Sequence, residues 1–303
     1  MTVKTIPGTD LEISEICLGG NVFGWTADRD ASFAVLDAFL AGGGNFIDTA
    51  DSYSAFVPGN SGGESETVIG EWLAAHPGAR DRVVIATKVG KHPDFMGLAP
   101  ENIRAAADAS LARLGTDSID LYYAHEDDPN TPIEDSLAAF AALIVAGKVR
   151  HVAASNYSAP RLAEALEIAE RESLPRYVAL QPQYSLVERS AYEGELSELC
   201  GREGLACIPY WGLARGFLTG KYRPGGPDVD SPRAAGAAAY LNDRGIVVLE
   251  ALDEVAAAHN AEVATVALAW LLAQPTVLSP IASARNVEQL APLLAVSELR
   301  LSA

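Results

Sequence analysis

Four side chains whose chemistry suits a carbonyl reaction lie in three short segments of the first half of the chain. Asp48 and Tyr53 belong to FIDTADSY, Lys88 to IATKVG and His125 to LYYAHEDD. Reduction of a carbonyl needs a hydride on carbon and a proton on oxygen, and a phenol can supply that proton. Because free tyrosine has a pKa of about 10, the phenol needs a neighbouring cation near neutral pH. We therefore expect Lys88 to assist Tyr53.

The other two side chains complete the same chemistry. Asp48 would hold Lys88 charged and oriented, and His125 would hydrogen-bond and polarise the substrate oxygen. Each residue alone has an ordinary explanation, since strand-end lysines usually form ion pairs and loop tyrosines usually pack. The catalytic interpretation depends on all four side chains meeting, and so on the elements that position them.

A repeated pattern of strand-length apolar runs and helical segments predicts those elements. Helical spacing is clear at Ile103, Ala107, Leu111 and Leu114, and Ser158 with Pro160 predicts a helix start. Ser61 with Glu64 fits a capping box. The strand-like runs cover residues 16–18, 45–49, 83–89, 119–124, 149–154, 177–181, 205–209 and 277–282.

Eight alternating units in 303 residues predict an α/β protein, a (β/α)₈ TIM barrel that forms a single domain over 1–303. Residues 3–13, around Pro7 and Gly8, predict an N-terminal β-hairpin at the barrel bottom. An open doubly wound sheet is the main alternative, but LGGNVFG lacks the spacing of a dinucleotide-binding loop. In a barrel, residues at the carboxyl ends of strands share one mouth, and all four candidates lie there.

Charge and composition exclude several classes of partner. The net charge is −18, from 40 acidic and 22 basic residues, which disfavours nucleic acid and anionic membranes as partners. An anionic cofactor would therefore need locally placed cations and backbone N–H groups. The apolar run 263–273 is too short to span a bilayer and predicts a buried helix. Three cysteines without a metal or disulfide spacing favour a cytoplasmic location, and the oligomeric state is left open.

Over nearly its whole length the chain resembles the aldo-keto reductases, in particular the branch that includes potassium-channel β-subunit-like reductases. FIDTADSY, IATKVG and LYYAHEDD are similar to the segments that supply that family's Asp, Tyr, Lys and His tetrad. The resemblance implies reduction of an aldehyde or ketone, a small-molecule carbonyl substrate, and NADP(H) as cofactor, with NAD(H) as an alternative. It also implies that the cofactor binds at the barrel mouth.

The resemblance further implies which residues hold the cofactor. Ser155 and Asn156 of AASNYS and Gln181 of LQPQYS would hold the nicotinamide carboxamide, and Tyr210 would stack on its ring. YWGLARGFLTGKY is similar to the pyrophosphate loop, and PIASARNVEQL to the adenosine segment, where Arg285 would pair with a 2′-phosphate. The remaining implied contacts, together with Asp48, are Gly20, Asn21, Val22, Trp211, Gly212, Leu213, Arg215, Gly216, Lys221, Ser283 and Gln289.

This chain departs from the family pattern at several of these positions. Trp211 and Gly212 stand where Ser and Pro are common, which alters the rigidity of the loop. Asn21 and Val22 stand where Thr and an aromatic residue are frequent, and Leu293 replaces a common Asn. We expect a changed pocket shape beside the first strand and fewer contacts to adenine.

Two other functions stay open, and several residues have competing interpretations. The chain could be a nucleotide-binding regulatory subunit with little turnover, or a metal-assisted hydrolase using His125 with Asp127 and Asp128. Glu64 and Glu66 suit helix capping better than catalysis. Residues 223–236 predict a mobile surface loop. Side chains that would line a substrate pocket or simply pack are Phe23, Trp25, Phe56, Val57 and Tyr184.

Overall fold

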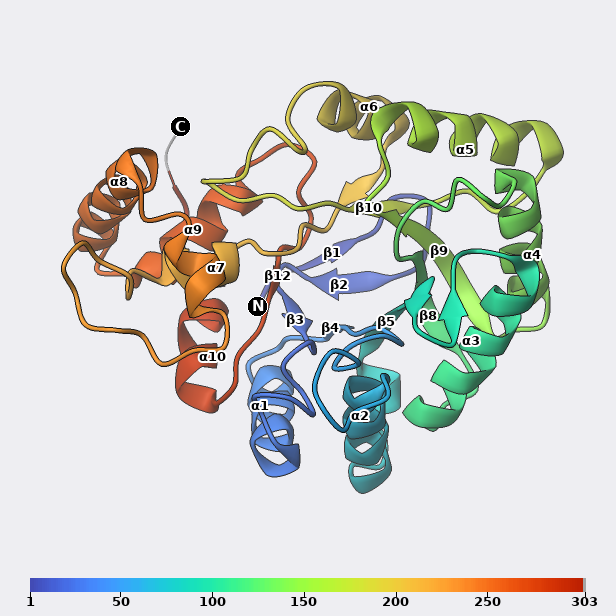
Figure 1. Cartoon of the computed structure of the whole chain (residues 1–303), viewed down its shortest axis with the longest axis horizontal. Helices are drawn as coiled ribbons and strands as arrows, with labels where there is room; N and C mark the ends of the chain where they lie inside the picture. The colour runs from blue at the N-terminus through green and yellow to red at the C-terminus, as the bar shows by residue number, and fades with distance from the viewer. Residues whose placement is uncertain (302–303) are drawn as a thin grey trace.

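Eight parallel strands form one sheet that curls into a barrel, with helices around its outside (Figure 1). The computed structural model of the chain describes residues 1–301, so the last two residues of the predicted domain 1–303 lie outside the described part. In sheet order the strands are β11 (Ala206–Cys207), β10 (Ala179–Gln181), β9 (Val149–Ser155), β8 (Ile119–Ala124), β5 (Val84–Val89), β4 (Phe46–Asp48), β3 (Cys17–Gly19) and β12 (Ile281–Ala282).

The two ends of this sheet are joined by backbone hydrogen bonds ahead of β12. Cys207 N–H donates to Thr276 O and Leu278 N–H donates to Cys207 O, both at 2.9 Å. A parallel bridge between Cys207 and Val277 closes the ring. The predicted (β/α)₈ barrel is confirmed.

The outer helices follow the strands in chain order. They are α1 (Arg29–Ala41), α2 (Glu64–Ala75), α3 (Pro100–Leu114), α4 (Ile133–Val145), α5 (Ala159–Glu172), α6 (Glu195–Glu203), α7 (Ala234–Ala238), α8 (Asp243–His259), α9 (Val263–Leu272) and α10 (Val287–Leu294). Helical 3₁₀ turns cover η1 (Arg80–Arg82), η2 (Ala214–Thr219) and η3 (Ala295–Glu298). In Figure 1, α7, α8 and α9 gather at the left of the barrel.

The predicted N-terminal hairpin is present as β1 (Val3–Thr5) and β2 (Glu12–Ser14), which pair antiparallel. Ile6, Leu11 and Ile13 are at most 1% exposed and join the apolar cluster inside the barrel. The hairpin therefore closes one end of the barrel, and the mouth lies at the other.

Strand alternation decides which side chains point into the barrel. Phe46 on β4 and Ala86 on β5 belong to the interior cluster, and Asp48 and Lys88 follow each of them by two residues. Because side chains on a strand alternate between faces, both polar groups lie on the interior face at the mouth end. Thr87, between Ala86 and Lys88, points instead toward the outer helices.

Two helix starts show where the sequence signals were right and wrong. Ser158 caps α5 by accepting from the Arg161 N–H, as predicted. The capping box predicted at Ser61 is wrong, because α2 begins at Glu64 after Gly63, whose φ is +83°. The Glu64 carboxylate accepts the Ser61 N–H at 2.7 Å, so half of the box exists, one turn ahead of the helix.

The structure adds a hairpin that the sequence did not predict, β6 (Lys91–His92) with β7 (Phe95–Met96), beside the mouth end of β5. No single helix among residues 1–301 is long and apolar enough to cross a membrane; α8 and α9 reach that length only together and meet at 96°. The predicted buried helix at 263–273 is confirmed as α9, in which seven of the ten side chains are buried.

Candidate active site

The four predicted catalytic side chains converge at the barrel mouth. Lys88 Nζ lies 2.6 Å from Asp48 Oδ2 and donates to the Thr49 carbonyl at 2.7 Å and to Tyr53 Oη at 2.8 Å. Asp48 and Lys88 are each 1% exposed. The ammonium thus has three fixed acceptors, and one of them is the Tyr53 phenol.

Burial keeps the Tyr53 phenol un-ionised at rest. Desolvation, followed by the negative charge of Asp48, raises the pKa of Tyr53 well above its usual 10. Tyr53 Oη also donates to Asp48 Oδ2 at 3.2 Å. The phenol therefore keeps its proton near neutral pH, and an ammonium at this distance is able to stabilise a phenolate.

His125 completes the group from the end of β8. Its ring centroid lies 6.3 Å from that of Tyr53, edge to face. Burial, with the charges of Lys88 and Lys91, lowers the pKa of His125 well below 6.5, so the imidazole is neutral at neutral pH. Its Nδ1 is buried without a hydrogen-bond partner among the described residues. A neutral imidazole can donate to a carbonyl oxygen without carrying a charge into the site.

The residues predicted to hold a carboxamide form a connected network next to Asp48. Gln181 Nε2 donates to Asp48 Oδ1 at 2.8 Å, and Ser155 Oγ donates to the Gln181 carbonyl at 2.8 Å. Asn156 Nδ2 donates to Ser155 Oγ at 3.1 Å, and Tyr210 Oη donates to Asn156 Oδ1 at 2.8 Å. This chain of bonds links the end of β9 to the tetrad.

The predicted contacts beside β3 and β12 also meet, with one exception. Ser283 Oγ donates to Asn21 Oδ1 at 2.7 Å, and Arg285 N–H donates to Gln289 Oε1 at 3.1 Å. Gly20 N–H donates to the Asp48 carbonyl at 2.7 Å. The Val22 side chain is only 4% exposed and packs in the outer core, so only its backbone remains for a ligand.

The segment from Trp211 to Gly216 has an unusual backbone. Trp211, Ala214 and Arg215 have φ values of +55°, +47° and +58°, a region in which L residues are rare. Within residues 1–301, no backbone or side-chain acceptor pairs with the N–H of buried Gly212. An unpaired N–H in such a loop fits an anionic group such as pyrophosphate.

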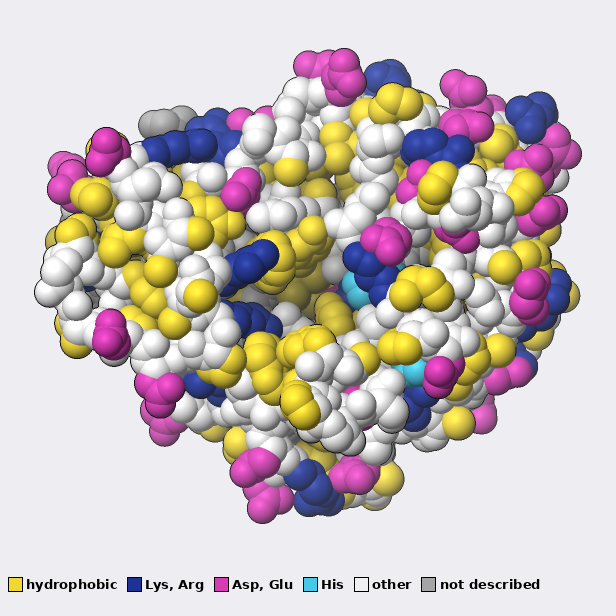
Figure 2. Space-filling view, viewed as in Figure 1, with side chains coloured by type: hydrophobic (Ala, Val, Ile, Leu, Met, Phe, Trp, Pro, Cys, Tyr) yellow, Lys and Arg dark blue, Asp and Glu magenta, His cyan; other side chains and the backbone are white. Residues whose placement is uncertain are grey.

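Four cations without a carboxylate partner surround this loop, in the part of the chain that the structure describes: Arg215, Lys221, Arg233 and Arg285. Burial, then the charge of Arg285, lowers the pKa of Lys221, and burial with the charges of Arg215 and Arg285 lowers that of Arg233. Lys and Arg side chains reach into the central hollow in Figure 2. In a protein of net charge −18, grouped and unpaired cations indicate an anion site.

Arg233 lies beside the candidate site, although the sequence does not predict it there. It lies just before α7, in the segment 223–236 that was predicted to be only a mobile surface loop. Its guanidinium lies 5.3 Å from the Trp25 ring centroid. The positive charge of Arg233 opposes the rise in the pKa of Tyr53. No sequence signal places it, because the path of a loop this long is set by packing: α7 contacts η2, and Arg223 forms a bidentate pair with Asp253.

The apolar residues proposed for a substrate pocket divide into two groups. Phe23 and Tyr184 are 0% and 2% exposed and pack in the core. Trp25 and Phe56 meet at the mouth with ring centroids 5.0 Å apart, and Phe56 is 67% exposed. Val57, next to Phe56, is half-buried. The exposed lip therefore consists mainly of Trp25 and Phe56.

The acidic residues near the mouth are engaged in structural contacts. Asp127 forms a bidentate pair with Arg161 at 2.8 and 2.9 Å, and Asp128 accepts from Leu98 N–H and Thr131 Oγ1 at 2.8 Å. No group of three His, Cys, Asp or Glu side chains within residues 1–301 could hold a metal ion. The structure gives no support to the metal-assisted alternative.

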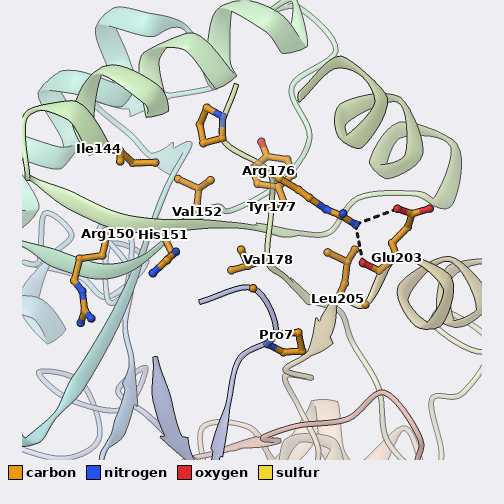
Figure 3. A pocket seen from close by; sticks show the side chains of 13 residues that line it. Pro7, Ile144, Arg150, His151, Val152, Arg176, Tyr177, Val178, Glu203 and Leu205 are labelled. Atoms are coloured by element: carbon orange, nitrogen blue, oxygen red, sulfur yellow. Dashed lines mark hydrogen bonds and ion pairs between the residues drawn. The ribbon is translucent and has the colours of Figure 1, made fainter. Parts of the chain in front are cut away.

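A second hollow, of about 440 Å³, lies at the opposite end of the barrel near the hairpin tip (Figure 3). Its arginines already have partners: Arg176 Nη2 donates to Glu203 Oε2 at 3.0 Å, and Arg150 Nη2 donates to Asp10 Oδ2 at 2.8 Å. Their charges are therefore compensated, in contrast to those at the mouth.

Comparisons with known proteins agree with this geometry. The family model described as "Aldo/keto reductase family" matches residues 15–303. "Uncharacterized oxidoreductase YrpG" from Bacillus subtilis is 34% identical over 97% of this chain and 90% of its own length. "Norsolorinic acid reductase stcV" from Emericella nidulans is 33% identical over 94% and 74%. "Probable voltage-gated potassium channel subunit beta" from rice, Oryza sativa, is 30% identical over 96% and 89%.

Matches of this identity and extent indicate one fold and one general chemistry, oxidoreduction, for which the family generally uses nicotinamide cofactors. Asp48, Lys88 and His125 lie at or next to the carboxyl ends of β4, β5 and β8, and Tyr53 lies in the loop after β4. The chain belongs to the aldo/keto reductase family.

Proposed function

We propose that the protein reduces an aldehyde or ketone to an alcohol with NADPH, and that Tyr53 donates the proton. The observation that carries this proposal is the 2.8 Å hydrogen bond from Lys88 Nζ to Tyr53 Oη, with Asp48 on the other side of the ammonium. A phenol, a cation and a carboxylate in this order can release and recover one proton per turnover.

The bound nicotinamide would supply the hydride that reaches the carbonyl carbon. His125, being neutral, donates a hydrogen bond to the carbonyl oxygen and orients it. As negative charge grows on that oxygen, Tyr53 transfers its phenolic proton there and becomes a phenolate paired with Lys88. A proton from solvent then restores the phenol, so that one hydride and one proton are consumed for each alcohol formed.

The preference for NADPH is supported by the cations around the mouth. Arg215, Lys221 and Arg233 suit the pyrophosphate, and Arg285, next to Gln289, suits a 2′-phosphate, where a planar guanidinium binds two oxygens at once. NADH lacks that phosphate and stays the alternative cofactor.

The substrate is proposed only as a small carbonyl compound. The Trp25 and Phe56 lip offers an apolar surface beside Tyr53. The Emericella relative is named for reduction of norsolorinic acid, which supports carbonyl reduction in this branch without naming the substrate here. A cytoplasmic location is proposed with it.

A regulatory subunit with slow turnover is the second candidate, because the rice relative is named as a potassium channel subunit. The complete tetrad favours turnover. A single-turnover measurement separates the two functions: a cofactor that binds tightly but is oxidised very slowly by every carbonyl supplied would favour the regulatory role.

The main experiment combines binding with turnover. The protein is titrated with NADPH and with NADH, and a panel of aldehydes, ketones and keto esters is then assayed with each cofactor by following its oxidation. We expect both cofactors to bind, NADPH more tightly, and at least one carbonyl compound to be reduced. If neither NADPH nor NADH bound, the proposal would be contradicted outright.

A further inference from the structure

Asp51 is a buried carboxylic acid that the reaction described above does not use. It lies three residues after Asp48, in the loop that leads away from β4, and is 0% exposed. Neither of its carboxyl oxygens has a hydrogen-bond partner among residues 1–301. The Ser52 backbone N–H is near enough to lower the pKa of this carboxyl, although it forms no hydrogen bond with either oxygen.

The surroundings of Asp51 are already negative. Glu66 of α2 is 0% exposed and accepts from Thr87 Oγ1 at 2.5 Å and from Arg113 Nε at 2.7 Å. Arg113 therefore neutralises Glu66, and no cation in the described part of the chain is left to pair with Asp51. An unpaired buried charge is among the most costly groups that a protein can contain.

The other polar groups that face this region do not supply a partner either. Tyr122 on β8 has a buried hydroxyl to which no described residue bonds, and the charge of Asp51 contributes to raising the pKa of that phenol. The His92 ring packs against Gly62, next to the Asp51 backbone carbonyl. The ammonium of Lys88 is already held by its three acceptors on the inner face of β5.

Asp51 is nevertheless connected to the catalytic lysine. Its backbone N–H donates to the Lys88 carbonyl at 3.3 Å, and the carbonyl of Thr49, two residues earlier, accepts from Lys88 Nζ. The charge of Lys88 lowers the pKa of the Asp51 carboxyl, and an ionised Asp51 would in turn attract the Lys88 ammonium. The segment that carries Asp51 is thus the segment that orients Lys88.

We propose that Asp51 is a positioning residue for the reduction, and that it must remain un-ionised for Tyr53 to deliver its proton efficiently. This inference rests on the proposed function. An ionised Asp51 places a second negative charge near Lys88, which disfavours the Tyr53 phenolate that must form during the reaction. It also repels Glu66.

The pH range of the effect follows from the burial of this carboxyl. Desolvation, then the charge of Glu66, raises the pKa of Asp51 from 3.8 to about 8. The un-ionised form therefore predominates at neutral pH and is lost as the pH rises through about 8. Reduction should slow over the same interval.

The test compares the pH profile of the full-length wild-type protein with that of Asp51→Asn, at saturating NADPH and with one reducible carbonyl compound. The amide cannot ionise, so the ratio of kcat at about pH 9 to kcat at about pH 6.5 should be roughly three- to tenfold higher in Asp51→Asn than in wild type. The matched control is Asp117→Asn at an exposed position, which should keep the wild-type ratio.

A second measurement does not depend on turnover or on the folding of a variant. Infrared spectroscopy of the wild-type protein near neutral pH should show the carbonyl stretch of an un-ionised carboxyl, which disappears as the pH rises through about 8. Absence of that band, or the same alkaline decline in Asp51→Asn and wild type, would overturn the inference. If wild type reduces no carbonyl compound, the proposed function fails, while the infrared test of Asp51 still stands.

Discussion

Arg285 and Lys221 belong to the same group of cations, yet each has a distinct expected role. Arg285 lies beside Gln289 in the segment proposed for the adenosine end, and Lys221 lies against Gly216 of the loop proposed for the pyrophosphate. Only the 2′-phosphate distinguishes NADPH from NADH, whereas both cofactors carry the pyrophosphate. Arg285 should therefore affect the binding of NADPH alone, whereas Lys221 should affect the binding of both cofactors.

We expect Arg285→Ala to weaken NADPH binding by about 1.5 to 3 kcal/mol and NADH binding by much less, since a hydrogen bond to a charged group contributes energy of that order. Lys221→Ala serves as the control and should weaken both cofactors to a similar extent. Fluorescence titration of each variant with each cofactor measures the difference. Equal losses of binding free energy for NADPH and NADH in Arg285→Ala would show that this guanidinium does not bind the 2′-phosphate.

Much of the candidate site could be predicted from the sequence, because side chains alternate regularly between the two faces of a strand. Asp48 and Lys88 follow apolar interior residues by two positions, so their direction follows once the strands are identified. Arg233 was not predictable, since nothing local fixes the path of its loop. The burial of Phe23 and Tyr184 was equally hidden, because an aromatic residue in a loop segment can face either way.

Among the elements, α2 begins next to a glycine that leaves no room for a side chain. Gly63, which precedes it, has φ +83°, and a Cβ there would lie 2.3 Å from Arg113 Nε. Arg113 holds Glu66, so this glycine allows the buried ion pair to approach the backbone. Gly115, which ends α3, also has a positive φ, +61°, but a Cβ added there would have no atom of the described residues within 4 Å.

We expect Gly63→Ala to destabilise the protein by about 3 kcal/mol or more, because it adds a steric conflict to the conformational cost of about 1 to 2 kcal/mol. Gly115→Ala should show the conformational cost alone. Urea denaturation of the two variants measures the difference. A similar loss in both would mean that Arg113 moves aside freely and that the Glu66 pair does not depend on this glycine.

Element prediction succeeded where periodicity was long and failed where a local contact decides the boundary. The strand at 119–124 was predicted to the residue, and Ser158 marked the start of α5. The predicted strand at 205–209 shortens to Ala206–Cys207, because the following backbone leads to Tyr210, which bridges to Gln183. The β6 and β7 hairpin was missed because its strands have only two residues each.

The two ends of the barrel differ in how their charged side chains are paired. The mouth carries unpaired cations, whereas the opposite end carries a compensated network. There Arg150 donates to Asp120 at 2.7 Å and to Asp10 of the hairpin at 2.8 Å. The hydrogen bonds from His151 and Arg150 lower the pKa of Asp10 to about 2, so this carboxylate stays ionised and the link persists until the pH falls through that value.

We expect Arg150→Met to destabilise the fold by about 1 to 3 kcal/mol, because Asp120 is 2% exposed and would keep only Arg80 as its cation. Lys148→Met, which breaks an exposed pair with Asp108, should cost at most about 1 kcal/mol. Both variants should keep wild-type kcat, since this end lies far from Tyr53. A large loss of kcat in Arg150→Met at a temperature where it is folded would contradict this division of tasks.

The central claim is that the Tyr53 hydroxyl supplies the proton, and one substitution tests it most directly. Tyr53→Phe removes a single oxygen, the one that Lys88 Nζ contacts at 2.8 Å, and keeps the ring. Single-turnover reduction with pre-bound NADPH should slow by about 10² to 10⁴, while the NADPH dissociation constant stays within about threefold of wild type. A Tyr53→Phe protein that reduces the same carbonyl compound at a near-normal rate would contradict the account.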